Sequence, residues 1–179
     1  YSESQKSWVD FKENVKFSED EKSFFFVSDF QGTGRVYQYS VQGNRIRSYG
    51  NNKINITKFL RRDGKGNIFA SGFPLGSTDN YIYRFDSGGR QRLITKDSGY
   101  YSGVVSPDGK YILVNYSNIT TPNQLRLINT KKRTTTLLYD SKSNEFANYQ
   151  LGKTELFYIP NRDGLKLPAK WILPPGFDK

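Results

Sequence analysis

Residues 103–117 read GVVSPDGKYILVNYS, in which a short apolar segment, a polar turn and a strongly apolar segment follow one another. The turn Pro107-Asp108-Gly109 combines a proline, whose φ is fixed, with a glycine that tolerates a positive φ. Two earlier stretches have the same plan, VKFSEDEKSFFFVSD at residues 15–29 and TKFLRRDGKGNIFASG at residues 57–72. The sequence therefore predicts one type of β-hairpin three times.

The three hairpins recur at a regular spacing. Aligning Phe17, Phe59 and Val105 gives separations of 42 and 46 residues. A second pair of apolar segments follows each hairpin, at residues 35–48, 81–95 and 124–139. Four short strands with a period of about 40 to 50 residues are typical of a β-propeller blade, which packs only against its neighbours. We predict an all-β fold, a propeller fragment of about three four-stranded blades, at residues 11–55, 56–96 and 97–148.

The composition agrees with an all-β domain, and the distribution of charge along the chain argues against nucleic-acid binding. The 179 residues include 13 Tyr and 13 Phe, and aromatic residues suit half-buried strand surfaces. The formal charge of +10 is scattered along the chain. Its dense patches, Arg61-Arg62 and Lys131-Lys132-Arg133, fall in predicted turns, where solvated charges are expected. No basic stripe interleaved with stacking aromatics is present, so we expect no nucleic acid among the partners.

The repeat stops near Tyr149, and a different pattern follows. Residues 155–161 (ELFYIPN) and 165–173 (LKLPAKWIL) are apolar runs separated by a turn at Asp163-Gly164, which predicts a β-hairpin. Pro174-Pro175 then ends the second strand, because proline cannot donate a hydrogen bond to a sheet. A new domain is expected to begin here. The start at Tyr1, without an initiator Met, further suggests that the chain is cut from a longer protein.

The tail ELFYIPNRDGLKLPAKWILPPGFDK resembles the passage from propeller to α/β-hydrolase domain in the prolyl oligopeptidase family. The hairpins SPDGKY and FSEDEKSFFF are similar to those in the last blades of the dipeptidyl peptidase IV-like branch. The resemblance implies that residues 1–148 are propeller blades. Residues 149–179 would be a linker and the first strands of a peptidase domain that is itself absent.

For the full-length protein, the resemblance implies a serine exopeptidase that removes dipeptides or tripeptides from peptide N-termini, with Pro or Ala preference. Its partners would be peptide substrate, the remaining blades and the hydrolase domain, with a possible homodimer, in the periplasm or otherwise outside the cytoplasm. The family's Ser-His-Asp triad cannot lie in this chain, which has no His and no G-x-S-x-G motif. We therefore expect a non-catalytic portion that helps to gate and enclose substrate. The alternative is a non-catalytic propeller module that binds a peptide, glycan or protein partner.

One segment is a candidate substrate contact. Trp8-Val9-Asp10-Phe11-Lys12 resembles a family loop that lines the substrate cleft, which implies that Phe11 and Lys12 bind substrate. The segment departs from the family by a short deletion and by Lys in place of Arg, and a core Trp beside a solvated loop is the other interpretation. Without Cys or His, no metal site is expected. The stretch 63–67 (DGKGN) lacks the order of a calcium loop and is interpreted as a turn, and no cofactor is expected.

Overall fold

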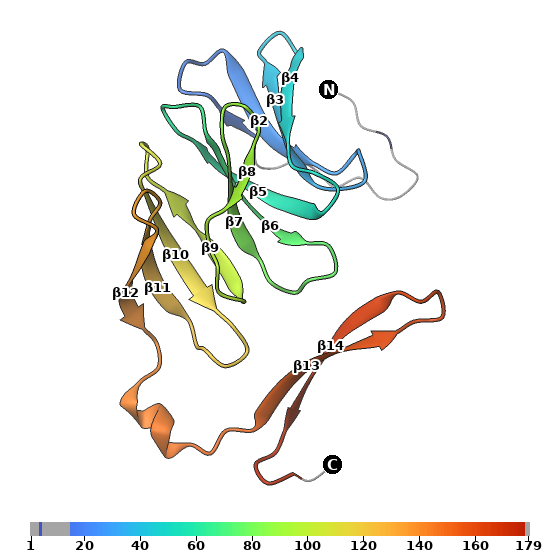
Figure 1. Cartoon of the computed structure of the whole chain (residues 1–179), viewed down its shortest axis with the longest axis vertical. Helices are drawn as coiled ribbons and strands as arrows, with labels where there is room; N and C mark the ends of the chain where they lie inside the picture. Colours follow the sequence, from blue (N-terminus) through green and yellow to red (C-terminus); the bar gives the residue numbers. More distant parts are fainter. Residues whose placement is uncertain (1–3, 5–14, 178–179) are drawn as a thin grey trace.

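The computed structural model describes Ser4 and residues 15–177, which form three four-stranded antiparallel sheets and a separate hairpin (Figure 1). The first sheet contains β1 (Lys16–Phe17), β2 (Ser23–Ser28), β3 (Arg35–Ser40) and β4 (Arg45–Tyr49). The second contains β5 (Ile54–Arg62), β6 (Ile68–Pro74), β7 (Tyr81–Phe85) and β8 (Gln91–Leu93). The third contains β9 (Tyr100–Val105), β10 (Tyr111–Ser117), β11 (Gln124–Asn129) and β12 (Thr134–Asp140). The predicted all-β fold with three four-stranded units is confirmed.

Each sheet is a simple meander in which the strands pair in sequence order. In β10 the burial alternates, with Ile112, Val114 and Tyr116 buried and the residues between them exposed, as the period of two in a strand requires. Gly109 takes the positive φ that the sequence predicts, at 67°, and Gly43 and Gly89 in other connecting turns also have a positive φ, at 86° and 88°. Local sequence and turn geometry therefore agree in the meander.

Two apolar cores join the sheets in sequence order. The first core lies between the first and second sheets and includes Phe25 and Phe59, whose ring centroids are 4.8 Å apart and nearly parallel. The second core lies between the second and third sheets and includes Phe69, Ile82 and Ile112, which are fully buried. Large aromatic side chains bury about 150–250 Å² each. Buried Phe and Tyr side chains therefore contribute, together with Ile and Val, to the packing of neighbouring sheets.

Hydrogen bonds that involve the main chain also connect neighbouring sheets. The N–H of Ile56 in the second sheet donates to the carbonyl of Gly34 in the first at 2.9 Å, and the N–H of Gly34 donates to Asn55 Oδ1 at 2.6 Å. A Cβ at Gly34 would collide with the carbonyl oxygen of Ile56. Between the second and third sheets, Asn80 Nδ2 donates to the carbonyl of Tyr101 at 2.7 Å. Glycine at position 34 is required because the two backbones approach so closely.

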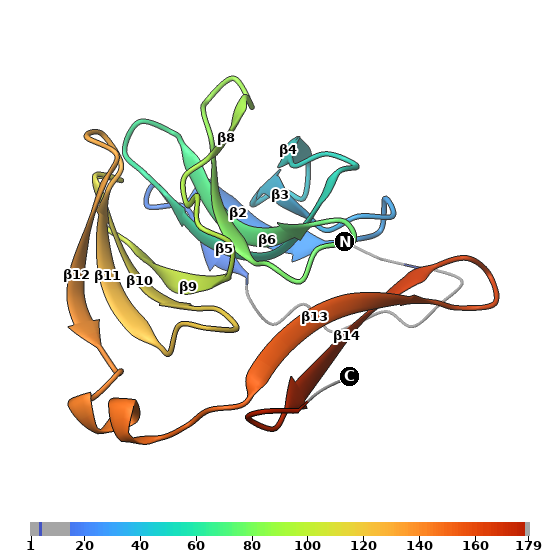
Figure 2. The same ribbon diagram turned by 60° about the horizontal axis from the view of Figure 1, so that its bottom comes forward.

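The tail forms the predicted hairpin, β13 (Lys153–Pro160) and β14 (Lys166–Leu173), after a short 3₁₀ helix η1 (Asn144–Asn148). Gly164 has a φ of 78° in its turn. Figures 1 and 2 show the hairpin as a long arm that leaves the third sheet and passes beside the second. Tyr158 in β13 donates a hydrogen bond to the carbonyl of Gly76 at 2.9 Å, so the arm contacts the sheets far back along the chain.

Three details differ from or refine the sequence interpretation. Arg61 and Arg62 end strand β5 and do not lie in the turn that follows. The turn 63–67 uses the buried Asp63 carboxylate internally, because it accepts hydrogen bonds from the backbone of Lys65 and Asn67 and from the Asn67 amide. The second sheet begins at Ile54, slightly before the expected boundary at 56. The assignment of residues 149–179 to a peptidase domain stays a prediction.

Candidate functional site

The candidate substrate contacts Phe11 and Lys12 lie outside the described residues. Their role in substrate binding therefore stays a prediction. The described part of the chain brings together a different set of polar and charged side chains, on the outer side of the boundary between the second and third sheets.

This boundary contains a groove of about 370 Å³, here called the rim groove, between β8 with the segment that follows it and strands β11 and β12. Its apolar lining comes from Leu93, Ile94, Tyr101 and Ile128. Its charged lining comes from Arg92, Lys96, Asp97, Arg126 and Arg133. A concave site with an apolar surface and a few convergent polar groups is the usual form of a ligand site in a protein.

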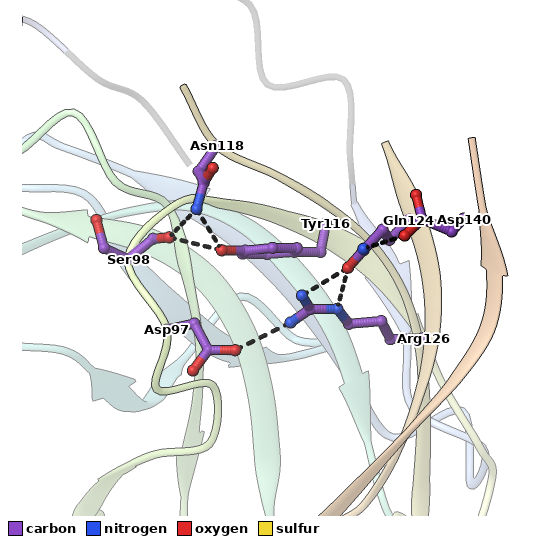
Figure 3. Close-up of polar contacts among 7 residues, drawn as sticks. All are labelled: Asp97, Ser98, Tyr116, Asn118, Gln124, Arg126 and Asp140. Atoms are coloured by element: carbon purple, nitrogen blue, oxygen red, sulfur yellow. Dashed lines mark hydrogen bonds and ion pairs between the residues drawn. The ribbon is translucent and has the colours of Figure 1, made fainter. Parts of the chain in front are cut away.

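Arg126 lines the rim groove and is held in place by neighbouring side chains (Figure 3). Its guanidinium donates to Asp97 Oδ2 at 2.9 Å and, through Nε and Nη2, to Gln124 Oε1 at 2.9 and 2.6 Å. It also lies over the Tyr116 ring, 3.7 Å from the centroid, where a planar cation is attracted to the π system. Gln124 in turn donates to Asp140 Oδ2 at 2.7 Å. The guanidinium of Arg126 is therefore held in a fixed orientation, and most of its N–H donors are occupied.

The same network continues to the connection between the two sheets (Figure 3). The Tyr116 hydroxyl donates to the carbonyl of Ser98 at 2.9 Å, and Asn118 Nδ2 donates to the Tyr116 hydroxyl at 2.7 Å. Asn118 Oδ1 accepts from the backbone N–H groups of Thr120 and Thr121, which fixes the loop between β10 and β11. The network therefore ties the segment entering the third sheet to that sheet's inner strands and fixes the wall of the rim groove.

Three ionisable groups around the network have pKa values that are shifted away from neutral pH. Burial raises the pKa of Tyr101, and nearby Asp97 adds to the effect. Burial, with a hydrogen bond to Asp79, raises the pKa of Tyr81 to about 12. Hydrogen bonds from the Lys142 backbone and then from Gln124 lower the pKa of Asp140. General acid–base catalysis needs a pKa near the working pH, and none of these three shifts moves a pKa toward neutral pH.

Neither a metal site nor a membrane span is found in the part of the chain that the structure describes. No three His, Cys, Asp or Glu side chains gather there in a way that could hold an ion. Among residues 4 and 15–177, no helix has the length and apolar character needed to cross a bilayer.

Sequential four-stranded antiparallel sheets, joined side by side through apolar cores, define this chain as a segment of a β-propeller. A family profile described as dipeptidyl peptidase IV (DPP IV) N-terminal region matches residues 1–123. The chain belongs to this family.

Individual relatives agree with the family match. Dipeptidyl peptidase 4 of Trichophyton equinum is 25% identical over 182 residues, covering 96% of this chain and 23% of that protein. Dipeptidyl peptidase 4 of Arthroderma otae is 26% identical over 159 residues, covering 85% of this chain and 20% of that protein. The chain thus spans about a fifth to a quarter of the length of these relatives.

Solved structures support the fold. The crystal structure of Porphyromonas gingivalis dipeptidyl peptidase 4 aligns with a TM-score of 0.82 at 23% identity, over 92% of this chain and 24% of that one. A prolyl endopeptidase structure aligns with a TM-score of 0.67 at 13% identity, also over 92% of this chain and 24% of that one. The predicted propeller fragment and the resemblance to the dipeptidyl peptidase IV-like branch are confirmed.

Proposed function

We propose that this chain is the propeller portion of a serine exopeptidase that removes dipeptides or tripeptides from peptide N-termini, with Pro or Ala near the cleaved bond. The observation that carries the proposal is the family match over residues 1–123, together with a sheet arrangement that aligns with a dipeptidyl peptidase at a TM-score of 0.82. The curated relatives named above are dipeptidyl peptidases, which supports a proteolytic reaction in the full-length protein.

Within that enzyme, this chain is non-catalytic. Acyl transfer by a serine peptidase needs a general base beside the nucleophile, usually His, and the sequence contains none. The sheets would instead form part of the wall that encloses the peptide and gates its entry, with Phe11 and Lys12 as candidate contacts. The reaction takes place outside the cytoplasm, in the periplasm or an equivalent compartment.

The hairpin arm is suited to packing against the rest of such a protein. Large apolar side chains are exposed on it, including Leu156, Tyr158 and Ile172. Apolar surface of this kind, exposed on a two-stranded hairpin, usually marks a protein contact. The remaining blades and the hydrolase domain are the proposed intramolecular partners, and a second copy of the full-length protein is a possible further one.

Hydrolysis of a chromogenic Xaa-Pro dipeptide amide by the full-length protein tests the proposal, with the isolated chain assayed beside it. We expect release of the chromophore by the full-length protein, its abolition by a serine-directed inhibitor, and no release by the isolated chain. A blocked N-terminus on the same substrate serves as the control, because an exopeptidase requires the free amine. Cleavage of the blocked substrate at an equal rate would contradict an exopeptidase.

If dipeptide amides fail, tripeptide amides with Pro or Ala at the same place are the next substrates. Failure of both, with an intact fold by circular dichroism, would favour a non-catalytic propeller module that binds a partner.

A further inference from the structure

The rim groove has more positive charge than the polar network around it uses. Four cationic side chains and one carboxylate line it, for a formal charge of +3. Asp97, the one carboxylate, is already paired with Arg126 at 2.9 Å. Arg92, Lys96 and Arg133 form no ion pair with any residue that the structure describes. Like charges gathered in a concave site repel one another and attract an anion.

We propose that the rim groove is a binding site for a small anionic ligand with an apolar body, in which Arg92 and Arg133 hold a carboxylate or phosphate group. This site goes beyond the peptidase reaction and does not depend on it. The two arginines reach the groove from different sheets, since Arg92 lies in β8 and Arg133 precedes β12. A guanidinium offers a planar pair of donors that matches both carboxylate and phosphate geometry.

The backbone at Arg133 shows that the turn itself does not call for an arginine. Arg133 has a φ of 58°, a left-handed conformation that glycine or asparagine adopts more easily. The turn is closed by its own backbone, because the Arg133 N–H donates to the carbonyl of Asn129 at 2.8 Å. Asn129 Oδ1 also accepts from the N–H of Lys132 at 2.9 Å. A side chain held at a backbone cost beside a groove is consistent with a role in binding.

The rest of the groove determines the kind of ligand. Leu93, Ile94 and Ile128 give it an apolar surface, and Leu93 is 44% exposed on the outermost strand of its sheet. The volume of about 370 Å³ is near the lower end of the range for small-molecule sites. A single aromatic or branched aliphatic group with one acidic group fills such a space, whereas a large folded partner does not.

The test measures binding to the full-length protein by isothermal titration calorimetry at low ionic strength. The probes are phenyl phosphate, 3-phenylpropanoate, inorganic phosphate and the neutral 3-phenylpropanol. We expect at least one aromatic anion to bind about tenfold or more tightly than the neutral alcohol, and more weakly as salt is added. The stronger of the two anions identifies the acidic group as phosphate or carboxylate. Equal binding of the alcohol, or no binding of either aromatic anion, would overturn the proposal.

Arg133→Gly is the decisive variant because glycine suits the positive φ, so the turn is preserved while the guanidinium is lost. We expect Kd for the preferred anion to rise about fivefold, with the midpoint of thermal unfolding unchanged or higher. Arg92→Gln should weaken binding by a similar factor from the opposite wall.

Lys132→Gln is the matched control, since it removes one charge from the same turn but does not line the groove. It should leave Kd within about twofold of the unsubstituted protein. If Lys132→Gln and Arg133→Gly weaken binding equally, the effect is one of overall charge and the proposed site is wrong.

Discussion

The first and third sheets are built around the same turn, yet they place different residues at its critical position. In the first sheet, Ser18 bonds to Asp20 and accepts from the Ser23 N–H, and in the third, Ser106 bonds to Asp108 and accepts from the Tyr111 N–H. The residue after the aspartate has a positive φ in both turns. It is Glu21 at 56° in the first and Gly109 at 67° in the third.

The surroundings of the two turns explain the difference. A Cβ at Gly109 would lie 2.6 Å from Asp63 Oδ2 and 3.1 Å from the Phe69 ring, both in the second sheet or its turn. Glu21 is exposed and its side chain extends into solvent. Glycine is therefore needed in the third sheet for space as well as for backbone conformation, whereas in the first sheet it would serve only the backbone. A repeated motif thus has position-specific requirements that arise from its neighbours.

The largest expected effect is that of Gly109→Ala. A methyl group there strains the backbone and collides with Asp63, so we expect a loss of about 2–3 kcal/mol in the free energy of unfolding. Urea denaturation followed by circular dichroism measures it. Gly43→Ala is the control, because Gly43 also has a positive φ but nothing within 4 Å of an added Cβ. It should lose only about 1 kcal/mol, and equal losses would refute the packing explanation.

The next largest effect is expected when the serine of each turn is replaced, because the two turns should lose different amounts of stability. Ser18 is buried at 6% exposure and its hydroxyl also accepts from Ser23 Oγ, so Ser18→Ala should cost about 1–2 kcal/mol. Ser106 is more accessible to water, and Ser106→Ala should cost less, about 0.5–1 kcal/mol. Unfolding midpoints in urea rank the two variants. A larger loss of stability in Ser106→Ala would mean that burial does not determine how much each turn serine contributes.

Glu21→Gly should stabilise the protein. The substitution relieves the cost of a positive φ at a residue with a side chain, and no neighbour depends on that side chain for a hydrogen bond among the described residues. We expect a gain of about 0.5–1 kcal/mol, read as a higher midpoint of thermal unfolding. Loss of stability would show that the glutamate contributes more than its backbone strain costs.

The smallest effect is a pH dependence of the turn carboxylates. Hydrogen bonds from the Lys110 side chain, the Lys110 N–H and the Ser106 hydroxyl hold the pKa of Asp108 well below its usual range. A lowered pKa in the folded state adds stability above the unfolded pKa of about 3.9, and this stability is lost as the pH falls below it. The difference in urea midpoint between the protein and Asp108→Asn should therefore shrink between about pH 4 and pH 2. A constant difference would contradict this.

The repeat and its turns could be predicted from sequence because they depend on local chemistry. The alternation of VVSPDGKYILV, the Pro107-Asp108-Gly109 turn and the Asp163-Gly164 turn each specify a hairpin with neighbouring residues alone. The predicted turn position of Arg61 and Arg62 was wrong because β5 continues through both, with register shifts that lengthen the strand relative to β6.

The rim groove could not be predicted from sequence because its parts are distant along the chain. Arg92 and Arg133 line the same groove only after two sheets have packed, and Lys131-Lys132-Arg133 was interpreted as one solvated patch. The structure separates this patch, since only Arg133 lines the groove. A residue other than glycine at a positive φ does not by itself mark a site, since Glu21 also has a positive φ and does not line the groove. For Phe11 and Lys12, which lie outside the described residues, the prediction rests on resemblance alone.

The close main-chain contact between the first and second sheets at Gly34 affects how local unfolding would spread through the molecule. The second sheet meets the first through this main-chain contact and meets the third through Asn80. Such a chain behaves as a row of units coupled to their nearest neighbours. A destabilising substitution in the third sheet should raise the rate of amide exchange most in that sheet, less in the second sheet and least in the first. The close contact at Gly34 therefore adds to the apolar core in coupling the opening of the first sheet to that of the second.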